Sequence, residues 1–143
     1  MKTADRGITL KDVKIEHAAY QIPDPTAAAR WYVTHLGMTV KRSQRESPFV
    51  HFLADDGDAV MIEFYNNPKV PPPDHRAIDP LIMHIAFRAD DVAAARARLI
   101  AAGATPEGDI VVTESGDQLA MLRDPWGLPI QLAKRQVPMI GHA

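Results

Sequence analysis

Four polar residues lie at matching places in the two halves of the chain. His17 and His84 come near the start of each half, and Glu63 and Gln131 come near its end. Glu63 follows His17 by 46 residues, and Gln131 follows His84 by 47 residues. Neutral imidazole nitrogens combined with carboxylate and amide oxygens suit Zn, Ni, Mn, Co or Fe(II). Because the chain has no cysteine, a metal would have nitrogen and oxygen ligands. We therefore predict that these four residues hold one divalent metal ion of unspecified identity.

The same residues have a second interpretation, a hydrogen-bonded His–Glu network inside a binding cleft. A single His on a strand is most often structural. A carboxylate within an apolar strand is harder to explain, because burying it without a partner is costly. Glu63 lies in such a strand and is the only acid of the four, so we predict that it is also the catalytic residue.

The four positions match because the sequence contains an internal repeat. Residues 17–37 and 84–103 share an opening His, an Ala-Ala-Ala-Arg run and a glycine, in that order. Each segment leads to a short apolar stretch, at 60–65 and 128–133. Landmarks that recur in the same order indicate duplication rather than chance.

Each copy has the pattern of a βαβββ module. Alternating or apolar runs with β-branched residues predict the strands, and Ala- and Arg-rich runs predict the helices. Acidic residues and Pro25 favour the helix starts, and Gly37 and Gly103 are predicted helix C-caps. The first copy is predicted as strand 13–20, helix 27–36 and strands 39–43, 48–54 and 59–65; the second as strand 81–88, helix 92–102 and strands 110–114, 118–123 and 128–134.

The fold class that follows is α+β, with two tandem βαβββ modules whose curved sheets form a concave cleft. We place the modules at residues 13–65 and 81–134, together one globular domain at 13–134. Residues 66–80 join them, and five of the 12 prolines lie between 68 and 80. We expect this segment to be an extended connector without a helix.

Strand periodicity predicts which way the candidate residues point. Successive strand residues face opposite sides of a sheet, and the helices need an apolar face on which to pack. Glu63 and Gln131 should therefore point away from the helices, into the concavity. His51, Gln118 and Arg123 could line the same pocket, but a surface or hydrogen-bonded role is at least as well supported for each. Trp31 and Tyr32 mark either internal packing or a dimer surface.

The paired modules and the segment 122–132 resemble the vicinal oxygen chelate superfamily. This group includes glyoxalase I, methylmalonyl-CoA epimerase, fosfomycin-resistance transferases, extradiol dioxygenases and bleomycin-resistance proteins. The closing hairpin of the family is usually Asp-Pro-x-Gly-Asn-x-Ile-Glu, and this chain has Leu128 in place of the Asn and Gln131 in place of the final Glu. The resemblance implies metal-ligand positions at His17, Glu63, His84 and Gln131, and usually a homodimer.

The resemblance implies a glyoxalase-like, metal-dependent enzyme acting on a small oxygenated substrate. A metal that binds adjacent substrate oxygens acts as a Lewis acid on an enolate-like transition state, and Glu63 could then move a proton. This lyase or isomerase chemistry is favoured over an Fe(II) dioxygenase, which would have its carboxylate at the position of Gln131. The alternative is a metal-free small-molecule-binding or drug-sequestering protein of the bleomycin-resistance type, its cleft lined by Tyr65 and Trp126.

Composition excludes several other partners. A net charge of -2 with scattered lysines and arginines gives no basic patch for nucleic acid. No stretch approaches the length of apolar sequence needed to span a bilayer, so no membrane contact is expected. The polar first residues lack a signal core, so we expect a cytoplasmic protein. The sequence leaves open whether the cleft forms within one chain or across a dimer.

Overall fold

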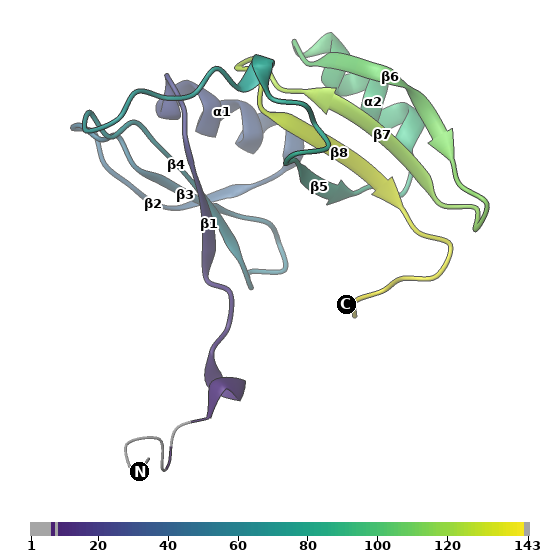
Figure 1. The fold of residues 1–143 in the computed structure, drawn as a ribbon, viewed down its shortest axis with the longest axis horizontal. Coiled ribbons are helices and arrows are strands. Elements are labelled where there is room, and N and C mark those ends of the chain that lie inside the picture. Colours follow the sequence, from purple (N-terminus) through teal and green to yellow (C-terminus); the bar gives the residue numbers. More distant parts are fainter. Residues whose placement is uncertain (1–6, 8, 142–143) are drawn as a thin grey trace.

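Two βαβββ modules follow one another along the chain, as Figure 1 shows. The computed structural model describes residue 7 and residues 9–141. The first module contains β1 (His17–Gln21), α1 (Pro25–Leu36), β2 (Thr39–Ser43), β3 (His51–Ala54) and β4 (Met61–Tyr65). The second contains β5 (Ile85–Arg88), α2 (Val92–Ala101), β6 (Thr105–Val112), β7 (Gln118–Arg123) and β8 (Pro129–Lys134). A short 3-10 helix, η2 (Leu10–Asp12), precedes the first module, and another, η3 (His75–Ala77), precedes the second. The predicted α+β repeat is confirmed.

Both modules form a four-stranded sheet of the same topology. The strand orders are β1-β4-β3-β2 and β5-β8-β7-β6, and the first and last strand of each module pair in parallel. Ala19 pairs with Glu63 in the first sheet, and Ala86 pairs with Gln131 in the second. His17 and His84 each lie two residues before the paired alanine, so the repeat holds residue for residue at the candidate site.

The helix boundaries follow local chemistry. The side chains of Asp24 and Asp91 accept hydrogen bonds from Ala27 N and Ala94 N, both at 3.0 Å, and so satisfy the free N–H groups of the first turn. Gly37 ends α1 in the left-handed conformation, with φ of 67°, as predicted. The prediction for Gly103 was wrong by one residue, because α2 has Ala102 as its C-cap.

Two other expectations from the sequence were wrong. The second strand of the second module, β6, begins at Thr105 rather than at residue 110. Its pairing with β7 is interrupted between Glu107 and Val111, and a bulge at an edge strand accommodates Pro106 and Gly108. The connector, expected to have no helix, contains the helical turn η3. This stretch is free of proline, and the side chain of Asp74 accepts a hydrogen bond from Arg76 N.

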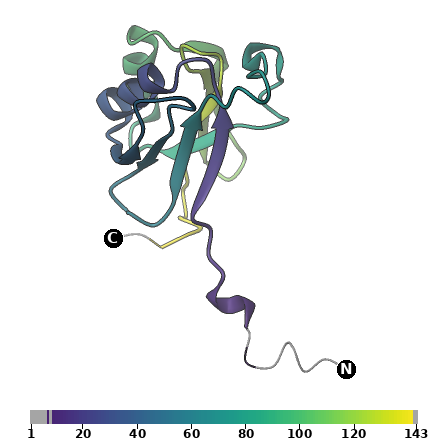
Figure 2. The same cartoon turned by 90° about the vertical axis from the view of Figure 1, so that its left-hand side faces the viewer.

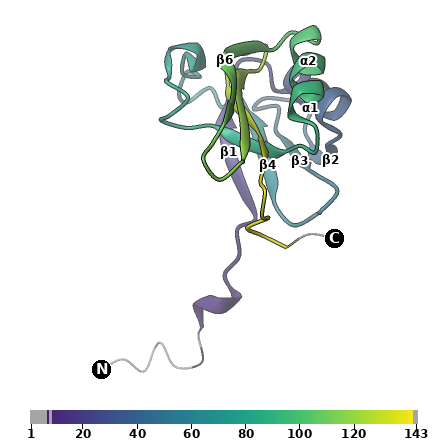
Figure 3. The same ribbon diagram turned by 90° about the vertical axis from the view of Figure 1, so that its right-hand side faces the viewer.

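The two modules pack through their helix-covered faces. Figures 2 and 3 show α1 and α2 on the same side of the sheets. The Tyr32 hydroxyl on α1 donates to Asp124 Oδ2 in the second module at 2.7 Å, and Trp31 Nε1 donates to Ala102 O at 2.9 Å. Trp31 and Tyr32 are thus buried at the module junction. The core is shared by both modules and includes Leu53, Phe64, Leu122, Ile130 and Leu132.

The opposite faces of the sheets stay open, because the two sheets do not close over one another within the chain. Among the described residues, no helix is long and apolar enough to cross a membrane.

Candidate functional site

His17 and Glu63 come together on the open face of the first sheet. His17 Nε2 lies 3.4 Å from Glu63 Oε1, and His17 Nδ1 lies 2.8 Å from Glu16 Oε1. The His17 ring also meets the Phe52 ring edge to face, with 5.2 Å between the centroids. The side chain of Glu63 is 15% exposed and that of His17 is 34% exposed. The pair is therefore shielded on one side and accessible from the other.

The contacts of His17 fix the chemistry of this pair. Because a carboxylate only accepts hydrogen bonds, the Glu16 contact assigns the proton of a neutral imidazole to Nδ1. The lone pair on Nε2 then faces the Glu63 carboxylate, so two acceptors point at one another. Such an arrangement needs a proton or a cation between the two atoms. A neutral imidazole whose other nitrogen donates to an oxygen is also the usual state of a metal-bound His.

His84 repeats this arrangement in the second module. Its Nδ1 lies 2.8 Å from Pro80 O, and because a carbonyl only accepts, Nδ1 carries the proton and Nε2 is left with its lone pair. His84 is exposed, and Gln131 is half-buried opposite Ala86 on the open face of its sheet. By residue type, these two side chains can also ligate a metal, but the neutral amide oxygen of Gln131 binds a cation less strongly than the carboxylate of Glu63 does.

The four residues form two separate half-sites within one chain. Among the described residues, no three His, Asp or Glu side chains gather closely enough to hold a metal ion. His17 and Glu63 form one half-site on the first sheet, and His84 and Gln131 form the other on the second. The structure thus brings together the members of one pair, and joint coordination by all four stays a prediction.

A small hollow lies in the first module, and a larger one lies at the junction between the modules. The small hollow, of about 140 Å³, lies beside His17 and is lined by Glu16, Lys41, Arg42, Phe52 and Met61. The larger hollow, of about 890 Å³, lies along β5, the end of α1 and the segment that follows β8. None of the four candidate residues lines either hollow, so neither hollow by itself is the site of metal chemistry.

The other residues considered from the sequence have structural surroundings. His51 is buried and its Nδ1 contacts Phe49 O at 2.8 Å. Gln118 opens β7 on the helix-facing side, because it alternates with the open-face residue Leu119. Tyr65 is half-buried on the open face of β4, whereas Trp126 packs against the core. Tyr65 is therefore accessible to a ligand on the open face.

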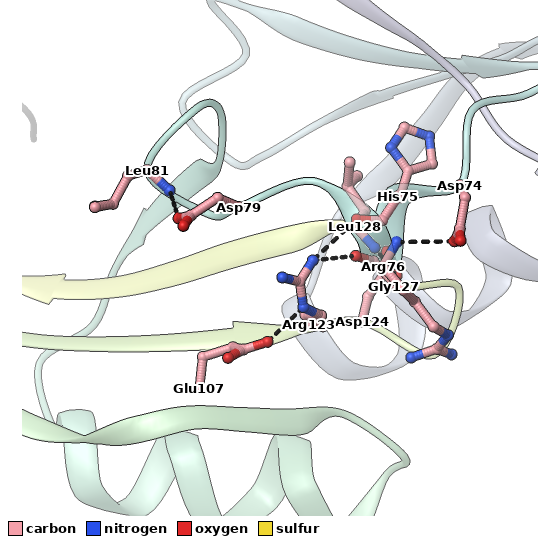
Figure 4. Close-up of polar contacts among 10 residues, drawn as sticks. All are labelled: Asp74, His75, Arg76, Asp79, Leu81, Glu107, Arg123, Asp124, Gly127 and Leu128. Carbon is pink, nitrogen blue, oxygen red and sulfur yellow. Dashed lines mark hydrogen bonds and ion pairs between the residues drawn. The ribbon is translucent and has the colours of Figure 1, made fainter.

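Arg123 is a clamp on the connector. Its guanidinium donates to His75 O at 2.9 Å and to Gly127 O at 3.2 Å, and it pairs with Glu107, as Figure 4 shows. His75 is 4% exposed, and its Nε2 contacts Gln21 O of the first module at 2.8 Å. The connector is thus tied to both modules. No sequence pattern indicated this role for His75, since the surrounding prolines predicted only an extended segment.

The most perturbed ionisable pair lies at the junction rather than on an open face. Burial raises the pKa of the Asp124 carboxyl, although hydrogen bonds from Tyr32, Leu128 N and Trp126 N lower it. Burial and the Asp124 carboxylate raise the pKa of the Tyr32 hydroxyl well above its usual value. Tyr32 therefore stays protonated and donates to Asp124. This pair joins the modules and has no access to a ligand on the open faces.

The family model for the Glyoxalase/Bleomycin resistance protein/Dioxygenase superfamily matches residues 14–132. The chain belongs to this superfamily. Solved structures with the same fold include TnmS3, an antibiotic binding protein from Streptomyces sp. CB03234, at 23% identity, with 86% of this chain and 96% of that chain covered and a TM-score of 0.66. SMU.1112c is 29% identical over 84% of this chain and 97% of its own, also with a TM-score of 0.66.

A glyoxalase-related enzyme from Fulvimarina pelagi is 20% identical, with 90% and 93% of the two chains covered and a TM-score of 0.69. No curated protein matches the chain. Members of the superfamily with binding and with enzymatic descriptions thus share this fold. The choice between those functions depends on the residues of the open faces, because a fold alone does not determine function.

Proposed function

We propose that the protein is a metal-dependent enzyme of this superfamily, acting on a small oxygenated substrate, with a site that two copies of the chain complete together. The observation that carries the proposal is the His17–Glu63 pair. When the His17 ring is neutral, two acceptors face one another at 3.4 Å while Nδ1 of the His is already engaged by Glu16. A divalent cation bound by both groups removes the repulsion between the two lone pairs.

Exposed apolar residues around both half-sites support assembly from two copies. Val13 and Ile15 alternate with His17 and are 68% and 71% exposed. Leu81 and Ile82 precede His84 and are 86% and 75% exposed. Clustered exposed apolar side chains mark interaction surfaces. Because the helix-covered faces already join the modules within a chain, a second copy is the partner that can bring the first sheet of one chain against the second sheet of another.

In this assembly, His17 and Glu63 of one copy and His84 and Gln131 of the other would hold the ion. When bound, the ion supplies Lewis-acid polarisation of adjacent substrate oxygens. Glu63 is the group that moves a proton, because the amide oxygen of Gln131 cannot act as a base at neutral pH. The carboxylate lies on β4 and the amide on β8, which favours lyase or isomerase chemistry over a dioxygenase of the family pattern.

A mixing experiment with two variants tests both the metal and the assembly. His17→Ala and His84→Ala are each expected to bind little metal when purified without chelator, as measured by elemental analysis. When the two variants are unfolded together and refolded, mixed dimers gain one intact site, so about a quarter of the wild-type metal content returns with random pairing. A site within one chain gives no recovery. Gln131→Ala is expected to lower the metal content, and Gln118→Ala is its matched control, because it removes the same side chain from the other face.

The proposal fails if wild-type protein binds no stoichiometric metal. It also fails if both His variants retain wild-type metal content. If the wild-type protein binds metal but the refolded mixture of His17→Ala and His84→Ala binds none, the metal site stands and the assembly from two copies is overturned.

A second candidate function is metal-free binding of a small apolar molecule. It is favoured by the 890 Å³ hollow, whose volume lies within the usual range for ligand pockets and whose walls include Leu36, Met38, Ile85, Phe87 and Leu132. An environment-sensitive apolar dye tests this. Binding that persists with excess chelator and is lost in Ala95→Trp, which fills the hollow from α2, would favour this function.

A further inference from the structure

Phe52, which lines the small hollow, connects Glu63 to a cationic edge strand. Arg42 pairs with Phe52 across β2 and β3, and Phe52 pairs with Glu63 across β3 and β4. The three residues therefore form one cross-strand row. Because neighbouring strands lie about 4.8 Å apart, the backbone of Arg42 is about 10 Å from that of Glu63. Phe52 lies between the cation and the acid in this row and supplies an apolar ring there.

A bulge in β2 directs two cations to the same place. The pairing of β2 with β3 is irregular between Val40 and Arg42, and both Lys41 and Arg42 line the hollow. In a regular strand, these two neighbours would point to opposite faces. Bulges commonly redirect side chains next to binding sites.

One cation at this end of the hollow has no partner of its own in the described part of the chain. Lys41 Nζ forms an ion pair with Asp58 at 2.9 Å. The guanidinium of Arg42 has no hydrogen bond or ion pair among the described residues. The nearby carboxylate of Glu16 is engaged by His17 Nδ1. Arg42 is therefore the cation whose charge remains available to a ligand.

We infer that Arg42, supported by Lys41, forms an anion-binding subsite for the substrate of the proposed enzyme, and this inference rests on the proposed function for the other end of the cleft. The substrate then has adjacent oxygens at the His17–Glu63 end, an unsaturated middle over Phe52, and a carboxylate or phosphate at Arg42. A planar guanidinium binds either anion through two parallel hydrogen bonds. A volume of about 140 Å³ accommodates such a terminal group and not a whole ligand.

Two matched probes test the subsite by calorimetry on the full chain loaded with Zn²⁺. Catechol supplies adjacent oxygens on a flat ring, and 3-(3,4-dihydroxyphenyl)propanoate adds a carboxylate on a short arm. We expect the second probe to bind about tenfold more tightly than the first, the usual effect of one charge-assisted contact. Arg42→Gln should remove this preference and leave catechol binding unchanged. Arg45→Gln is the matched control, because Arg45 is exposed and lies outside the hollow.

Competition identifies the preferred anion. Inorganic phosphate and acetate are each titrated against the carboxylated probe, and the stronger competitor indicates the terminal group. The preference should weaken at high salt because Arg42 is exposed.

Equal affinity for the two probes, an unchanged preference in Arg42→Gln, or no binding of either probe overturns the subsite. A preference that depends on Arg42 and persists in the presence of chelator, in a protein that binds no metal, keeps the subsite and rejects the metal proposal. Normal metal binding with equal probe affinities rejects the subsite alone.

Discussion

Removal of the Tyr32 hydroxyl should weaken the junction between the modules. The hydroxyl is fully buried and donates to Asp124 Oδ2 at 2.7 Å. Asp124 Oδ1 accepts from Trp126 N and Leu128 N, both at 2.9 Å, so Tyr32 is the partner of the second oxygen. Tyr32→Phe keeps the ring and its packing against Phe64, and leaves one carboxylate oxygen without a partner.

The expected loss in the free energy of unfolding is about 1.5–3 kcal/mol at pH 7, the value of a hydrogen bond to a charged group. It should depend on pH. Burial raises the pKa of the Asp124 carboxyl while the Tyr32 hydrogen bond lowers it, so the variant raises this pKa further. Because the folded protein binds this proton more tightly than the unfolded chain, the contribution of Asp124 to stability falls as pH rises from the usual carboxyl pKa through the raised one. Below that window the carboxyl is protonated in both states, and the loss should shrink to about 1 kcal/mol.

Equilibrium urea unfolding, followed by the fluorescence of the two tryptophans, Trp31 and Trp126, measures this loss. The protein concentration is held fixed, because association of copies would shift the midpoint. Tyr65→Phe is the control, since it removes a half-buried hydroxyl with no hydrogen bond among the described residues, and it should change stability by less than about 0.5 kcal/mol. A Tyr32→Phe protein as stable as wild type, or a loss that is the same at every pH, would refute this reasoning.

Three further predictions concern stability and use the same urea assay. Leu122→Ala, which opens a cavity at a fully buried position, should cost about 2–5 kcal/mol, and a cost below about 1 kcal/mol would contradict the assigned core. Asp24→Ala and Asp91→Ala each remove a helix N-cap and should cost about 1 kcal/mol, with additive effects in the double variant. Gly127 has a φ of 92° and an added Cβ would meet the η3 turn, whereas Gly108 has a φ of 75° and open surroundings. Gly127→Ala should therefore lower the free energy of unfolding clearly more than Gly108→Ala does. Equal losses would contradict the close approach of the connector.

The duplication made most of the fold predictable. Strand spacing within each copy, together with period-two alternation, was enough to predict equivalent positions for Glu63 and Gln131. In the structure these positions lie opposite Ala19 and Ala86. The start of β6 was missed because Pro106 and Gly108 disfavour a regular strand, and only pairing with β7 at an irregular edge makes the extended conformation favourable. Local patterns do not contain that information.

The arrangement of the two modules was beyond the reach of local patterns. The Tyr32–Asp124 contact joins residues 92 positions apart, and Trp31 reaches Ala102 across 71 positions. The clamp formed by Arg123 on His75 likewise depends on how the connector crosses the molecule. The sequence could therefore propose a shared metal site, but which half-sites meet depends on packing between modules and between chains.

The proposed assembly determines how the Glu63 carboxylates and the Gln131 amides are distributed between the two metal sites of a dimer. If like modules met across the dimer, one site would contain two Glu and the other two Gln, so the two sites would differ in charge and chemistry. When the first module of one copy meets the second module of the other, each site receives one carboxylate and one amide. All sites are then equivalent, each with a single proton-transfer group. Loss of metal from every site in His17→Ala, rather than from half of them, follows from this pairing and separates the two arrangements.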